Sequence, residues 1–148
     1  MHSLPMIDGC SPVFQPARLP QTDAQFGQDR DLMSVDLTQT YPEACPIAAY
    51  QRTLITSRAD GVVRLVDAFE FADAVEEICF RFVSAQKPIS LRECVRLGPV
   101  ELSWDGEMLP EITELPVCDA FAGGSWLVSL RAKNVSRRFI CGFTFELN

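Results

Sequence analysis

The strictest pattern in this sequence is an alternation of apolar side chains near its end. Five residues of one parity are apolar there: Phe139, Cys141, Phe143, Phe145 and Leu147. A period of two is typical of a β-strand with one buried face, because successive side chains point to opposite sides of a sheet. The pattern therefore predicts a half-buried strand, and a core built from sheets.

Two Asp-Gly pairs mark tight turns beside further alternating segments. Asp60-Gly61 separates residues 50–56 from 62–71, and Asp105-Gly106 follows residues 100–104. Asp-Gly favours the two-residue turns of β-hairpins. Turns recur about every 8 to 14 residues along the chain, as in β-sandwiches. We therefore predict an all-β fold, an antiparallel β-sandwich of roughly ten short strands, and not a βαβ fold.

Two regions fit the pattern less well. Residues 1–31 carry Pro5, Pro12, Pro16 and Pro20, and proline is excluded from helix interiors and central strands. We expect an extended N-terminal arm over 1–31, with short edge strands at 4–7 and 13–14, and one sandwich domain over 32–148. Residues 74–84 fit a helical stripe or a strand, and their β-favouring composition and neighbouring strands favour a strand.

Charge and hydropathy argue against two classes of partner. The net charge is −7 and the pI is about 4.6, whereas nucleic-acid binding needs a basic face. No apolar run approaches the roughly 20 residues of a membrane span. The first residues lack the basic and apolar regions of a secretory signal peptide. We therefore expect a cytoplasmic protein that binds neither nucleic acid nor membrane. The alternative is a longer parent protein whose signal peptide lies upstream or has been removed.

Six cysteines and one histidine define what metal or disulfide chemistry the chain can have. The cysteines stand at 10, 45, 79, 94, 118 and 141, with no Cys-x-x-Cys pair. A domain of this size needs no disulfide staples, so free thiols are favoured, although the even count leaves disulfides open. His2 is the single candidate metal ligand, and its alternative is a solvent-exposed terminal side chain. We expect no bound cofactor.

No catalytic constellation stands out. The sequence lacks a Gly-x-Ser-x-Gly elbow and a phosphate-binding Walker pattern. Asp67 and Asp119 lie in apolar surroundings, where we expect each to accept backbone N–H bonds, although a glycosidase-like acid/base pair is the alternative. We therefore assign no catalytic residue. The carbohydrate-binding candidates are Arg52, Trp104, Trp126 and Arg131, because arginine forks fit carboxylates and tryptophan faces stack on sugar rings.

Each of these candidates also has a simpler interpretation. Trp104 and Trp126 fit core or rim packing. Arg131 belongs to a basic cluster with Lys133, Arg137 and Arg138, which fits a solvated strand edge. The sequence alone does not decide between these interpretations and sugar binding.

Several short motifs follow one another in a characteristic order. They are His2-Ser3-Leu4-Pro5-Met6-Ile7-Asp8-Gly9, Asp36-Leu37-Thr38-Gln39-Thr40-Tyr41-Pro42, Tyr50-Gln51-Arg52-Thr53-Leu54, Val66-Asp67-Ala68-Phe69-Glu70-Phe71, Leu102-Ser103-Trp104-Asp105-Gly106, Cys118-Asp119 and Gly124-Ser125-Trp126. Their order and spacing resemble the C-terminal β-sandwich of heparinase II/III-like polysaccharide lyases, over nearly the whole chain. The chain departs from the family pattern at Ser3, where Asn is commoner, and after Gly9, where the usual Gln is missing.

The resemblance implies that the chain functions as one domain of a larger enzyme. In this family the sandwich packs on an α/α toroid, and the enzyme cleaves uronate-containing polysaccharides by β-elimination. Most catalytic groups come from the toroid, and His2 matches a histidine that helps to bind a structural metal in some members. We therefore expect a non-catalytic sandwich domain whose partners are a toroid domain or subunit, an acidic polysaccharide, or a second copy in a homodimer. The alternative is a free-standing carbohydrate-binding or structural interaction module.

Overall fold

A computed structural model describes residues 4–13, 20–116 and 124–147. Nearly all of this part is β-strand, and every strand pair is antiparallel. No helix among these residues is long and apolar enough to cross a membrane. His2, Cys118 and Asp119 lie outside the described residues.

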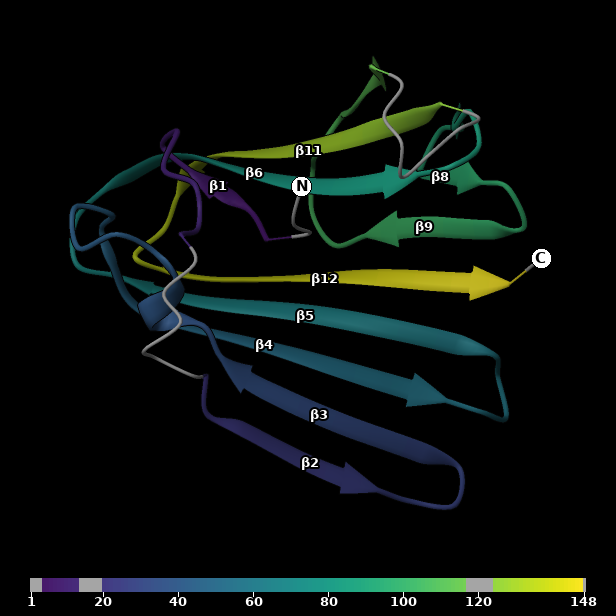
Figure 1. Cartoon of the computed structure of the whole chain (residues 1–148), viewed down its shortest axis with the longest axis horizontal. Coiled ribbons are helices and arrows are strands. Elements are labelled where there is room, and N and C mark those ends of the chain that lie inside the picture. The colour runs from purple at the N-terminus through teal and green to yellow at the C-terminus, as the bar shows by residue number, and fades with distance from the viewer. Residues whose placement is uncertain (1–3, 14–19, 117–123, 148) are drawn as a thin grey trace.

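The strands form two sheets (Figure 1). The small sheet has the order β1 (Met6–Ile7), β6 (Val75–Ser84), β11 (Ser125–Val135) and β10 (Pro110–Leu115). The large sheet has the order β2 (Thr22–Phe26), β3 (Arg30–Asp36), β4 (Ile47–Ser57), β5 (Val62–Phe71), β12 (Arg138–Leu147), β9 (Val100–Trp104), β8 (Cys94–Leu97) and β7 (Ile89–Ser90). A short 3-10 helix, η1 (Thr38–Thr40), precedes β4. The predicted all-β antiparallel sandwich is confirmed.

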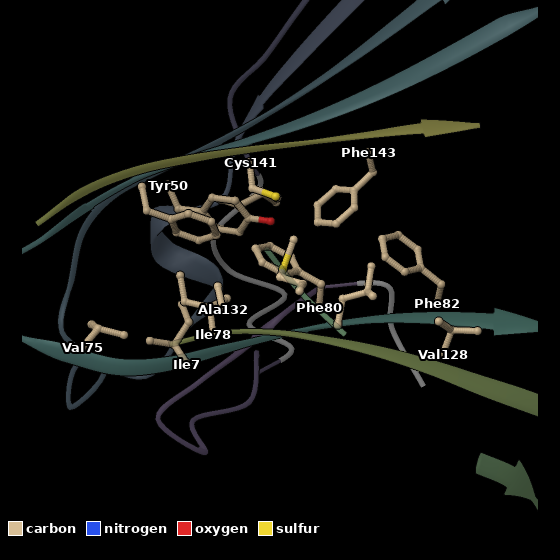
Figure 2. Close-up of a cluster of buried hydrophobic side chains, with 14 of the residues drawn as sticks. Ile7, Tyr50, Val75, Ile78, Phe80, Phe82, Val128, Ala132, Cys141 and Phe143 are labelled. Carbon is tan, nitrogen blue, oxygen red and sulfur yellow. The ribbon is translucent and has the colours of Figure 1, made fainter. Parts of the chain in front are cut away.

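Aromatic side chains fill the space between the two sheets. Phe143 of β12 lies 4.7 Å from Phe80 and 5.0 Å from Phe82 of β6, measured between ring centroids. Figure 2 shows these rings meeting between the two layers. Because Cys141 and Phe143 are buried while Leu147 is exposed, the alternating segment at the chain end does bury one face, and its end projects from the core.

The two Asp-Gly pairs serve different connections. Gly61 has a φ of +64° and joins β4 to β5 in a hairpin, which confirms the predicted turn. Gly106 has a φ of +82°, but the strand that follows it, β10, pairs with β11 in the small sheet. The second Asp-Gly pair therefore begins a crossing between sheets.

The two regions that fit the sequence pattern poorly both contain strands. Residues 75–84 form β6, which confirms the prediction of a strand there. In the region expected to be an extended arm, β1 pairs with β6, and β2 pairs with β3 as the last strand of the large sheet. No strand lies at Val13, and Phe14 is outside the described residues.

Candidate functional site

The large sheet extends beyond the small sheet that covers it. In Figure 1, β2, β3 and β4 fan away from β6 and β11. Cross-strand pairing places Ala24, Met33, Leu54 and Leu65 in one row with the buried Phe143. Paired residues share a face of the sheet. The row therefore continues the core side of the sheet past the edge of its cover.

A second row lies beside the first. It contains Phe26 and Val63, which pairing connects through Asp31 and Thr56. We define the wing face as Ala24, Phe26, Met33, Leu54, Val63 and Leu65. Phe26 is 81% exposed and Met33 is 39% exposed, whereas Phe143 in the first row is fully buried. Exposed apolar side chains grouped on one face mark an interaction surface more often than scattered ones do.

A buried ion pair lies next to the wing face, in the row of Val35, Arg52, Asp67 and Cys141. Asp67 is fully buried. Its Oδ1 and Oδ2 accept hydrogen bonds from Nε and Nη2 of Arg52, each at 2.7 Å, and Oδ1 also accepts one from the Tyr50 hydroxyl at 3.0 Å. The expectation that Asp67 accepts backbone N–H bonds is wrong, because these partners are side chains of β4.

This geometry determines what Arg52 can do. Its side chain is only 14% exposed, and its fork is occupied by the Asp67 carboxylate in the bidentate arrangement that makes such pairs strong. Little of the guanidinium remains accessible to a sugar carboxylate. Arg52 therefore fits a role in holding β4 against β5 better than the predicted role in carbohydrate binding.

Two tyrosines flank the ion pair and stay protonated. The Tyr41 hydroxyl donates to the Pro5 carbonyl oxygen at 2.7 Å, and the Tyr50 ring stacks on Phe69 with centroids 4.2 Å apart. Burial raises the pKa of both hydroxyls well above the usual value, and the Asp67 charge adds to the effect. A phenol with so high a pKa is a poor general base near neutral pH. Near neutral pH both hydroxyls are therefore protonated and act as hydrogen-bond donors within the chain.

Trp104 lies beside a hollow of about 960 Å³ on the described surface. The indole Nε1 donates to the Met108 carbonyl oxygen at 3.1 Å, so the polar end of the ring is engaged within the chain. The hollow is lined by Glu93, Glu101 and Glu107 as well as Arg92. Three carboxylates repel an acidic polysaccharide, so this hollow suits a neutral or cationic ligand better than a uronate.

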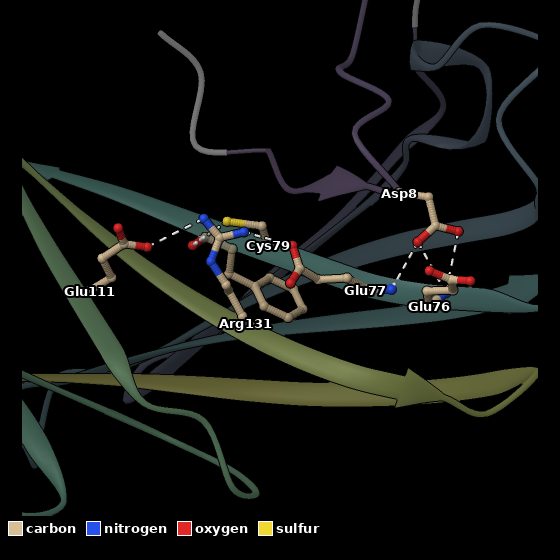
Figure 3. A network of polar contacts seen from close by, with 7 residues as sticks. Asp8, Glu76, Glu77, Cys79, Glu111 and Arg131 are labelled. Atoms are coloured by element: carbon tan, nitrogen blue, oxygen red, sulfur yellow. Dashed lines mark hydrogen bonds and ion pairs between the residues drawn. The ribbon is translucent and has the colours of Figure 1, made fainter.

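The two candidates on β11 lie on opposite faces of the small sheet. Trp126 shares the parity of the buried Val128 and Leu130, and Lys87 Nζ lies 5.2 Å from its ring centroid. Arg131 has the other parity and points away from the core. Its guanidinium pairs with Glu77 at 2.6 Å and Glu111 at 3.3 Å, as Figure 3 shows. The two carboxylates neutralise the Arg131 charge that a sugar would have met.

The structure does not assemble the four predicted residues into one site. Arg52 is inside the sandwich, Trp104 is at the end of β9, and Trp126 and Arg131 are on opposite faces of β11. Over residues 4–13, 20–116 and 124–147, no group of three or more potential metal ligands is close enough to hold an ion. His2 is outside that part of the chain, so its predicted role as a ligand stays a prediction.

The wing face was missed by sequence reasoning. Part of its signal was present, because Ala24 and Phe26 alternate with polar residues in β2. The prolines that precede this segment, up to Pro20, concealed it. Neither a protein-family model nor a curated protein matches the chain. The similarity to heparinase II/III-like lyases therefore rests on the sequence motifs alone.

Proposed function

We propose that the chain is a non-catalytic β-sandwich domain of the heparinase II/III-like kind, which docks through the wing face on a catalytic α/α toroid. The parent reaction is the β-elimination of uronate-containing polysaccharides. The observation that carries the proposal is the wing face itself. Its first row of apolar side chains continues from Phe143 in the core and ends in solvent at Met33 and Ala24.

Burial of the wing face supplies a physical reason for docking. Removing apolar surface from water is favourable by about 25 cal/mol per Å². A sheet with one apolar face is stable when another layer covers it, and a layer of helices is one of the standard solutions. The helices of a toroid would extend the cover that β6 and β11 begin.

The polar interior agrees with a supporting role. Asp67, Arg52 and Tyr50 bind one another inside the sandwich, and such buried networks fix one arrangement of strands more than they perform chemistry. The ion pair lies in the row next to Met33 and Leu54, so it also holds the wing strands in place. In this proposal the acid and base of β-elimination belong to the toroid.

The alternative, a free-standing carbohydrate-binding or structural interaction module, has less support. Its best candidate surface is the hollow beside Trp104, and the three glutamates there disfavour the acidic glycans that the motifs suggest. Trp126 is covered by Lys87, and Arg131 is held by two carboxylates. None of these residues offers a continuous sugar platform.

The proposal is tested by titrating the chain with a separately produced α/α toroid of a heparinase II/III-like lyase in a calorimeter. We expect binding, and we expect Met33→Glu to weaken it by at least about tenfold, because a buried, unpaired carboxylate costs more than 1.4 kcal/mol. Ile140→Glu is the matched control. Ile140 is 71% exposed and lies on the opposite face of the same sheet, since it has the other parity from Cys141.

The control distinguishes specific binding through the wing face from non-specific hydrophobic association. Circular dichroism first establishes that both variants are folded. Binding that is lost equally with Met33→Glu and Ile140→Glu, or no binding by the unaltered chain, contradicts docking through the wing face.

A further inference from the structure

Among the four sheet edges in the described chain, β2 is the one without protection. β1 and β7 have only two residues each, and β10 begins with Pro110 and carries Glu111 and Glu114. Short strands, prolines and charges are common ways to block edge pairing. In contrast, β2 has five residues, all exposed, with no proline or basic residue and a single charge at Asp23.

The hydrogen bonds of β2 reveal which backbone groups face outward. The Gln21 carbonyl oxygen accepts from Asp36 N at 2.9 Å, and Gly27 N donates to the Arg30 carbonyl oxygen at 3.0 Å. In an antiparallel pair, alternate residues direct both backbone groups to the same neighbour. Odd-numbered residues of β2 therefore face β3. The backbone groups of Thr22, Ala24 and Phe26 point to the free edge.

We propose that β2 pairs with β2 of a second copy of this chain, antiparallel, with Ala24 opposite Ala24. The two large sheets then become one continuous sheet across a twofold axis. In this register Ala24 exchanges two hydrogen bonds with its counterpart. Thr22 exchanges two with Phe26 of the second copy on each side of the axis. The outward-facing backbone N–H and C=O groups of all three residues are then hydrogen-bonded.

Side-chain chemistry selects this register over its neighbours. Asp23 lies opposite Gln25 of the second copy, a pair in which the amide donates to the carboxylate. A two-residue slip one way places Asp23 opposite Asp23, and like charges directly opposite each other are unfavourable. A slip the other way places Thr22 opposite Gln28, which is beyond the end of β2. The central register therefore gives the most hydrogen bonds and no repulsion.

The pairing also accounts for the exposure of Phe26. This side chain is 81% exposed in the single chain. In the dimer it lies across from Thr22 of the second copy, whose other neighbour on that face is Val35. The aromatic ring is then covered by the second copy. The dimer uses the edge of β2 and leaves Met33, Leu54 and Leu65 accessible. The proposed dimer therefore does not depend on whether a toroid docks on the wing face.

The test is sedimentation velocity of the full chain over a range of concentrations, with charge variants at position 25. We expect a concentration-dependent dimer. Gln25→Lys places an amine opposite Asp23 twice in each dimer and should tighten the dimer roughly three- to tenfold, and Gln25→Glu should weaken it to a similar extent. Gln28→Lys and Gln28→Glu carry the same charge changes outside the paired strand and should have little effect.

Two further readouts concern the backbone. Ala24→Pro removes an outward N–H that β3 does not use, so we expect a folded monomer. In hydrogen exchange, the Ala24 amide should gain protection as the dimer forms. A chain that stays monomeric to about 1 mM, even with Gln25→Lys, overturns the proposal. A dimer whose affinity is unchanged by Gln25→Lys and Gln25→Glu, or one in which the Ala24 amide gains no protection, also overturns it.

Discussion

Asp67→Asn should lower the free energy of unfolding by about 3 to 5 kcal/mol, the range for breaking a buried ion pair by removing one partner. Asn has nearly the shape of Asp, so the substitution leaves no cavity. It leaves the Arg52 guanidinium, whose side chain is only 14% exposed, without its counterion. It also turns a carboxylate that accepts three hydrogen bonds into an amide with one acceptor oxygen.

The size of the loss is measured by urea unfolding of the unaltered and altered chains. Glu70→Ala is the matched control, because its pair with Arg138 is at the surface with an N–O distance of 3.5 Å. Exposed pairs contribute at most about 1 kcal/mol. The double variant Arg52→Met with Asp67→Leu should recover most of the stability, since apolar replacements of a buried pair are often neutral or better. A loss for Asp67→Asn as small as that for Glu70→Ala contradicts the structural role of the pair.

Alkaline pH should destabilise the protein strongly. Burial raises the pKa of the Cys141 thiol to about 12 from 9.0, and the charges of Asp105 and Asp67 add to the shift. The unfolded chain gives up this proton near pH 9, whereas the folded chain keeps it. The unfolded state therefore binds fewer protons, and the free energy of unfolding falls as pH rises. The stability from this group is complete below pH 9 and is lost between about pH 9 and 12.

The expected slope is about 1.4 kcal/mol per pH unit for one such group. Cys141 alone then removes roughly 3 kcal/mol by pH 11. The pKa of Cys45 is raised by burial and by the neighbouring Cys10, and the pKa values of Tyr41 and Tyr50 are raised by burial. These groups act in the same direction, and the tyrosines do so above pH 10.

Urea unfolding between pH 7 and 11, in the presence of a reducing agent, measures this dependence. Cys141→Ala removes one titrating thiol, so its stability should fall less steeply above pH 9 than that of the unaltered chain. Equal slopes for the two proteins, or a stability that is flat to pH 11, would contradict the burial of a protonated thiol at this position.

Local patterns were sufficient to predict most of the fold. The alternation at 139–147 and the turn at Asp60-Gly61 each depend on neighbouring residues, and both were predicted correctly. Residues 75–84 were ambiguous, because Val75, Ile78, Cys79 and Phe82 also fit a helical stripe. Strand β2 was missed because it is short and directly follows a proline-rich stretch that ends at Pro20. Its pairing with β3 forms only in the folded chain.

The candidate site could not be predicted in the same way. Met33, Leu54 and Leu65 come from three strands and share a row only through pairing. Whether that row is covered depends on where β6 and β11 lie, which no local pattern specifies. The same applies to Arg52, whose partner Asp67 is 15 residues away in sequence and opposite in the sheet.

The proposed role of the chain as a non-catalytic supporting domain is most directly tested by a lyase assay of the purified chain alone. The assay follows the absorbance of the new unsaturated bond on a panel of acidic polysaccharides, at high protein concentration. We predict no increase in absorbance with any substrate. Turnover that copurifies with the chain would contradict this role and would mean that the chain contains an active site of its own.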